Sequence, residues 1–119
     1  MHQLQRELWG IGVDIIELKR FRVVRFLGRV AELVLSTVEY KEFVSHPDPV
    51  TYFASRFALK EAVIKASPEE LHYHDFEIGK RGKKPFVKML VPQKEACEFS
   101  VSLSHSTDYV AGFAIATST

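Results

Sequence analysis

The sequence has little cysteine and no long apolar segment. Cys97 is the single cysteine; because it cannot form an intrachain disulfide, a disulfide scaffold is excluded and a reducing compartment is favoured. Charged residues interrupt every apolar stretch before it reaches the length of a membrane span, and the opening MHQLQREL lacks the apolar run of a signal peptide. We therefore expect a cytoplasmic protein with no membrane partner.

The sequence also lacks an excess of charge of either sign. Lysine and arginine total 16, aspartate and glutamate total 15, and the formal net charge is +1. This balance argues against a general nucleic-acid binder, although it is compatible with local basic patches. With 119 residues, 46% of them apolar, the chain fits one globular domain over residues 1–119 with a core of its own.

The most informative segment is residues 52–66, YFASRFALKEAVIKA, which contains no glycine or proline and predicts a helix. At helical spacing, Arg56 and Lys60 form one i,i+4 row beside an apolar face, and Glu61 and Lys65 form another. Such a surface suits a phosphate-rich ligand with a divalent cation, because cations neutralise phosphate oxygens and a carboxylate can hold the metal. A plainer alternative is that Glu61 and Lys65 form an ordinary helix pair, worth roughly 0.2–0.5 kcal/mol.

The remaining pattern predicts an α+β fold. Ser36 and Glu39 have the capping-box spacing at the start of a short helix, and HPDP at 46–49 ends that helix. The expected elements are a strand at 9–16, helical segments at 17–34, 37–43 and 52–66, and strands at 75–79, 86–91, 99–104 and 109–117. Helices in the first half and antiparallel strands in the second predict an antiparallel sheet packed on one face by the long central helix.

Asp14 lies inside the apolar run 9–16. A buried, unpaired carboxylate would cost several kcal/mol, so Asp14 needs a cation or strong hydrogen bonds. A functional site and a structural cap at the strand end would both supply them, and the local sequence does not separate the two. His105 similarly fits either a turn or a ligand contact at the end of a strand.

Other polar clusters favour structural roles. The histidines at 46, 72 and 74 lack the spacing and partners of a metal site. The basic link KRGKKP at 80–85 predicts a solvated loop, with a phosphate contact as the second interpretation.

Four segments, in the same order, resemble the holo-[acyl-carrier-protein] synthase family, the small type of 4'-phosphopantetheinyl transferase. They are GIGVDIIELKRF at 10–21, LSTVE at 35–39, FASRFALKEAVIKA at 53–66 and SLSHSTDYVAGFAIA at 102–116. The resemblance implies transfer of the 4'-phosphopantetheine arm of coenzyme A to a serine of apo acyl carrier protein, with release of adenosine 3',5'-bisphosphate, in fatty acid biosynthesis. It also implies Mg²⁺ as cofactor and a homotrimer with active sites between subunits.

The resemblance implies roles for single residues. Asp14 and Glu61 match the magnesium ligands, and Lys65 matches the lysine that steadies the leaving group, so these three form the implied catalytic set. Ser104 and His105 match the motif that reaches the nucleotide from the adjacent subunit. The implied coenzyme A contacts are Arg56, Lys60, Lys65, Gly82, Pro85, Ser104 and His105. Whether Glu61 or a water accepts the serine proton stays open.

A basic cluster follows the first strand. Its members are Lys19, Arg20, Arg22 and Arg25, and Arg20 matches a family arginine. Because acyl carrier proteins are strongly acidic around the modified serine, the cluster would orient them. The alternative is a solvated helix face.

The segment after Ala66 departs from the family pattern. Family members continue into a glycine-rich K-A-[FL]-G-T-G-[IF] segment, whereas this chain has KASPEELHYHDFEI, without glycine. Glycine allows close backbone approach to a ligand, which Ser67-Pro68 does not. This difference is the only support for one alternative, a non-catalytic module of the same fold that binds acyl carrier protein. The sequence nevertheless favours an active transferase, because both metal-binding acids and all three cations of the long helix are retained. A different nucleotide-dependent phosphoryl transferase ranks last, since the sequence contains no P-loop.

Overall fold

The structure is a computed structural model that describes residues 5–119, so the first four residues of the opening segment MHQLQREL lie outside the described part. In chain order the elements are β1 (Leu8–Glu17), α1 (Leu18–Arg22), α2 (Leu27–Val34), α3 (Thr37–Ser45), α4 (Pro49–Ala66), the 3-10 turn η1 (Tyr73–Asp75), β2 (Phe76–Arg81), β3 (Lys84–Met89), β4 (Cys97–His105) and β5 (Tyr109–Ser118). Within this part of the chain, no helix is long and apolar enough to cross a membrane.

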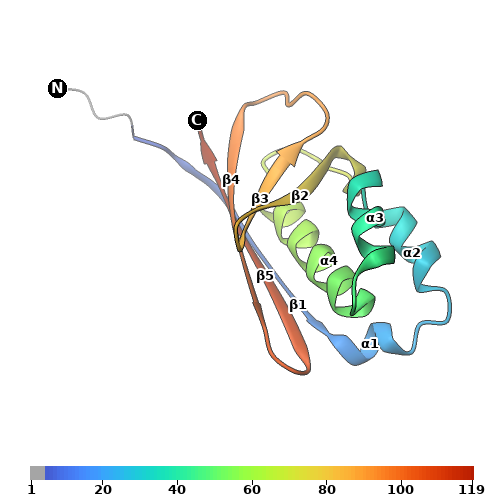
Figure 1. The fold of residues 1–119 in the computed structure, drawn as a ribbon. Coiled ribbons are helices and arrows are strands. Elements are labelled where there is room, and N and C mark those ends of the chain that lie inside the picture. The colour runs from blue at the N-terminus through green and yellow to red at the C-terminus, as the bar shows by residue number, and fades with distance from the viewer. Residues whose placement is uncertain (1–4) are drawn as a thin grey trace.

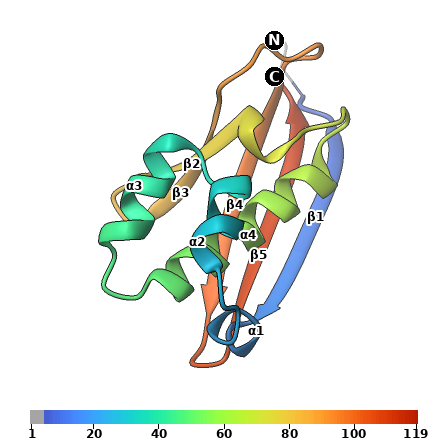
Figure 2. The ribbon, with the colours of Figure 1, turned by 90° about the vertical axis from the view of Figure 1, so that its right-hand side faces the viewer.

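The strands form two antiparallel sheets. One has three strands in the order β1-β5-β4, and the other pairs β2 with β3. Helix α4 lies along one face of the larger sheet, and α2 and α3 lie on the far side of α4 from that sheet (Figure 1); Figure 2 shows the molecule from this helical side. The expected α+β fold with a long central helix is confirmed, and the strands are divided between two sheets.

Glycines in β1 bring α4 close to the sheet. A Cβ added to Gly12 would lie 1.8 Å from the Ala62 carbonyl oxygen, and one added to Gly10 would lie 2.0 Å from that of Ala66. Ala62 and Ala66 are four residues apart and therefore occupy one stripe of the helix. Small residues on both elements let the two backbones meet, and this contact places Asp14, two residues after Gly12, beside the helix.

Helix α4 is buried on almost every side. Phe53 and Ala58 belong to a core cluster shared with the first three helices, while Leu59 and Val63 belong to a second cluster with β2 and the larger sheet. A helix that is covered all round has no wide polar face. The polar side of α4 is therefore narrower in the structure than the helical spacing of its charged residues predicted.

On the face of the larger sheet that points away from α4, the part formed by β1 and β5 is apolar and exposed, while β4 adds the exposed Ser102 beside Phe113. The exposed fractions are 56% for Ile11, 57% for Val13, 67% for Ile15 and 40% for Phe113. Val13 pairs directly with Phe113 in the β1–β5 ladder, so the apolar residues adjoin across strands. Contiguous apolar patches of this kind mark interaction surfaces.

Several predicted boundaries were wrong. The helical segment 17–34 is broken at residues 23–26, where Val23 and Val24 are weak helix formers. HPDP ends α3, but its second proline, Pro49, opens α4 after the N-cap Asp48. The basic link 80–85 is mostly strand, because only a two-residue turn separates β2 from β3 and Gly82 has the positive φ of 62° that this turn requires.

Candidate active site

Asp14, Glu61 and Lys65 lie together where β1 meets α4. Lys65 Nζ is 3.4 Å from Asp14 Oδ1 and donates to the Val13 carbonyl oxygen at 3.0 Å. Burial raises the pKa of Asp14, the hydrogen bond and charge of Lys65 oppose this, and the negative charge of Glu61 raises the pKa further. Among the described residues Lys65 pairs with Asp14 and not with Glu61, so the alternative of an ordinary Glu61–Lys65 helix pair was wrong.

Tyr73 also belongs to this site and was missed from the sequence. Its hydroxyl donates a hydrogen bond to Glu61 Oε1. Burial, and then the hydrogen bond to Glu61, raise the pKa of Tyr73 to about 12, so the phenol remains a donor at neutral pH. No sequence signal indicated this contact, because it depends on the path of the chain between Ala66 and η1.

The two carboxylates fit a magnesium ion. No group of three or more histidine, cysteine or acidic side chains that could hold a metal occurs within residues 5–119. Mg²⁺ does not need such a group, because it keeps several waters and uses one or two carboxylates together with substrate phosphates. The negative charge of Glu61 raises the pKa of Asp14, and a bound cation held by both carboxylates would oppose that effect.

The role expected for Lys60 as a coenzyme A contact was wrong in this structure. Its side chain is fully buried, and its ammonium donates to the carbonyl oxygens of Tyr73 at 2.7 Å and Phe76 at 2.8 Å. Nζ also lies 3.0 Å from Glu39 Oε1. Burial lowers the pKa of Lys60 and the Glu39 carboxylate opposes that shift. Lys60 therefore fixes the start of β2 to α4 and has no donor left for a phosphate.

Arg56 lies in a separate hollow whose lining carries charges of both signs, because the Glu42 carboxylate lines it as well. The hollow has a volume of about 330 Å³, and its lining includes Lys80 from β2, together with His46 and Tyr52. The Arg56 guanidinium lies over the Tyr52 ring, 4.6 Å from its centroid, and is 3.8 Å from a Glu42 carboxylate oxygen. Arg56 Nε is buried without a hydrogen-bond partner among the described residues. Arg56 and Lys80 therefore line the same hollow, whereas the sequence analysis predicted that Lys80 lies in a solvated loop.

The other implied coenzyme A contacts lie on elements that carry neither of the two carboxylates. Ser104 and His105 are exposed at the end of β4, and β5 lies between β4 and β1. Gly82 forms the β2–β3 turn, and Pro85 pairs with Lys80 beside the Arg56 hollow. Their contacts with coenzyme A stay predictions.

The predicted docking residues surround α1. Lys19, Arg20 and Arg22 are exposed on α1 and Arg25 on the link to α2. The charge of Arg20 is close enough to lower the pKa of Asp14, so this basic surface adjoins the carboxylates. Phe26 is 59% exposed between the guanidinium groups of Arg25 and Arg29, each 5.6 Å from its ring centroid. Phe21, by contrast, lies in the core.

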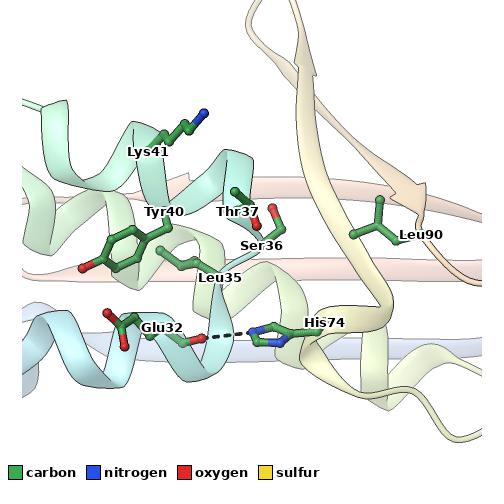
Figure 3. Close-up of a pocket in the computed structure, with 8 residues that line it drawn as sticks. All are labelled: Glu32, Leu35, Ser36, Thr37, Tyr40, Lys41, His74 and Leu90. Carbon is green, nitrogen blue, oxygen red and sulfur yellow. Dashed lines mark hydrogen bonds between the residues drawn. The ribbon is translucent and has the colours of Figure 1, made fainter.

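A hollow of about 510 Å³ lies elsewhere, between α2, α3 and the segments that carry His74 and Leu90 (Figure 3). None of the residues predicted to bind coenzyme A or metal lines it. Its main interest is the His74 ring, whose Nε2 donates to the Glu32 carbonyl oxygen at 3.1 Å and so ties η1 to α2.

Residues 10–116 match the family model of the 4'-phosphopantetheinyl transferase superfamily. The chain belongs to this superfamily. It is 37% identical to the holo-[acyl-carrier-protein] synthase of Chlorobaculum tepidum over 102 residues, covering 80% of this chain and 86% of that one. It is 36% identical to the enzyme of that name from Shouchella clausii over 114 residues, covering 86% and 92%.

Solved structures of superfamily members agree with this fold. The holo-[acyl-carrier-protein] synthase of Neisseria meningitidis has a TM-score of 0.80 and 32% identity, covering 92% of this chain and 98% of that one. The Bacillus anthracis synthase, solved in complex with coenzyme A (3',5'-ADP), has a TM-score of 0.80 and 27% identity, covering 94% and 98%. These likenesses confirm the family resemblance seen in the four sequence segments.

Proposed function

We propose that the chain is an active, Mg²⁺-dependent holo-[acyl-carrier-protein] synthase, which transfers the 4'-phosphopantetheine arm of coenzyme A to a serine of apo acyl carrier protein. The proposal rests on one structural observation: Asp14, Glu61 and Lys65 lie together where β1 packs against α4. The relatives of this chain carry the same activity in their names.

The residues divide the chemistry between them. Transfer joins the serine Oγ to the phosphorus of the arm and breaks the bond from that phosphorus to the bridging oxygen, which leaves on the bisphosphate. Bound magnesium, held by Asp14 and Glu61, would neutralise charge on the phosphate oxygens. The ammonium of Lys65 is about half exposed, with 51% of its side chain accessible, and can turn from Asp14 to the departing phosphate. Glu61 or a water accepts the serine proton.

The Arg56 hollow supports coenzyme A binding. The unpaired Arg56 Nε is a buried donor that a phosphate oxygen would satisfy. Lys80 lines the same hollow and adds a second positive charge. We assign this hollow to a phosphate of coenzyme A.

The basic surface around α1 is assigned to the carrier protein. Arg20→Glu is expected to raise the KM for acyl carrier protein by about tenfold or more, because charge complementarity directs encounter and register. The KM for coenzyme A should change by less than about twofold. Steady-state kinetics with each substrate varied would measure both, with the exposed Lys94→Glu as a charge-matched control. Equal effects on both substrates would show that α1 is not a docking surface.

We also propose a homotrimer in which the apolar face of the larger sheet is covered by neighbouring copies. Ile11→Glu, on that face, is expected to convert the assembly to monomers in light scattering coupled to size exclusion, because a charge would be buried in the interface. Val38→Glu, on the exposed side of α3 with Val38 54% accessible, should leave the assembly unchanged. A wild-type chain that is monomeric and active would contradict the proposed trimer.

The alternative of a non-catalytic carrier-binding module rests on the glycine-free link after Ala66. Chromatographic detection of adenosine 3',5'-bisphosphate separates the two functions. We expect release only when coenzyme A, apo acyl carrier protein and Mg²⁺ are all present. Binding of the carrier protein without release would favour the module.

A further inference from the structure

We propose that Tyr73 is a positioning residue for Glu61, so that its hydroxyl sets how tightly the two-carboxylate site holds magnesium; the inference rests on the proposed function, because it takes Glu61 as a metal ligand. Tyr73 comes from η1, which lies outside the four segments quoted in the sequence analysis although within the range matched by the family model. Its hydroxyl donates to Glu61 Oε1, and this contact leaves the other carboxylate oxygen, Oε2, for the metal.

The main chain around Tyr73 is held at several points. Lys60 Nζ donates to the Tyr73 carbonyl oxygen at 2.7 Å. On the next residue, His74 Nε2 donates to the Glu32 carbonyl oxygen at 3.1 Å, on the side of η1 that Figure 3 shows. The Leu90 amide donates to the Asp75 carbonyl oxygen at 2.8 Å. Anchors to α4, α2 and the end of β3 therefore fix η1 in place.

The Tyr73 ring is oriented as well. It packs edge-on against Phe57, with ring centroids 5.9 Å apart. Phe57 and Glu61 are four residues apart on α4 and therefore share one side of the helix. The ring thus lies along α4, with its hydroxyl directed at the Glu61 carboxylate.

Glu61 depends on this hydroxyl because its helix neighbour is engaged elsewhere. Among residues 5–119, Lys65 pairs with Asp14, so the Glu61 carboxylate takes its orientation from Tyr73. Hydrogen-bond partners behind a metal ligand fix the ligand's rotamer, and losing one typically costs about 10- to 100-fold in metal affinity or activity.

Tyr73→Phe tests the proposal because it keeps the ring and its packing on Phe57 and removes only the hydroxyl. The affinity for Mn²⁺, an ion visible by electron paramagnetic resonance, would be measured with saturating coenzyme A and no carrier protein, so that no turnover occurs. We expect the Mn²⁺ Kd to rise about tenfold. In the transfer assay, the half-saturating Mg²⁺ concentration should rise by a similar factor, while kcat at saturating Mg²⁺ stays within about twofold.

Tyr40→Phe, on α3, is the matched control and should leave the Mn²⁺ Kd and the Mg²⁺ requirement at wild-type values. The proposal is overturned if Tyr73→Phe has the same metal affinity as Tyr40→Phe, or if it loses turnover that added Mg²⁺ does not restore. A wild-type chain that shows neither metal-dependent transfer nor Mn²⁺ binding would overturn the proposed function itself. This outcome is distinct from a failure of the Tyr73 proposal, because it is seen in the wild-type protein before any variant is compared.

Discussion

Replacing Asp14 with asparagine or Glu61 with glutamine is expected to lower the transfer rate on the order of a hundredfold or more, at unchanged stability. Each amide keeps the size of the side chain but removes the negative charge that would hold the metal. Stability should not fall with Asp14→Asn, because burial already disfavours the charged form and raises the pKa of Asp14.

Initial rates of carrier modification at saturating Mg²⁺ would measure this effect, and urea unfolding would check the fold. Glu95→Gln, at an exposed position between β3 and β4, is the matched control for Glu61→Gln. Near-normal activity in either Asp14→Asn or Glu61→Gln would remove that residue from the metal site.

Lys60→Met is expected to destabilise the protein by about 3–5 kcal/mol, because it leaves the Glu39 carboxylate buried without its cation. Glu39 is 1% exposed; it accepts from the Ser36 and Ile78 amides, each at 2.8 Å, and its Oε1 is 3.0 Å from Lys60 Nζ. The carbonyl oxygens of Tyr73 and Phe76 would also lose their donor.

Urea unfolding would measure the loss. Lys65→Met removes a half-exposed cation and should change stability by less than about 1 kcal/mol. Combining Lys60→Met with Glu39→Gln should regain part of the loss, because no charge then stays buried. If Lys60→Met were as stable as wild type but bound coenzyme A weakly, Lys60 would be a ligand contact after all.

Local patterns in the sequence were sufficient for features that depend on neighbouring residues. The Ser36–Glu39 capping box was predicted, and both of its hydrogen bonds are present. The long helix was also predicted, although its first turn was not, because a proline at N1 begins a helix as readily as proline ends one.

Features that depend on tertiary contacts could not be predicted from spacing. Helical spacing placed Lys60 in a row with Arg56 on one polar side, but β2 and η1 cover that side, so Lys60 became an internal cation. The same spacing paired Lys65 with Glu61, whereas the close approach of β1 at Gly10 and Gly12 offers it Asp14 instead.

The family resemblance supplied what local physics left open. From the residues alone, Asp14 was equally consistent with a structural cap and a functional site. The motif that carries Asp14 also carries the two glycines that seat α4, so one segment provides both the carboxylate and the packing that brings it to Glu61. Tyr73 lies outside the four segments that carry the sequence resemblance, and only the structure brings it to the site.

The most direct test of the account is intact-mass spectrometry of apo acyl carrier protein after incubation with this chain, coenzyme A and Mg²⁺, with an EDTA-treated sample as control. The account predicts that the carrier protein gains the mass of one 4'-phosphopantetheine arm, and only when the metal is present. An unchanged carrier mass in the presence of Mg²⁺, with binding of the carrier protein still measurable, would contradict the proposed transferase and favour the non-catalytic module.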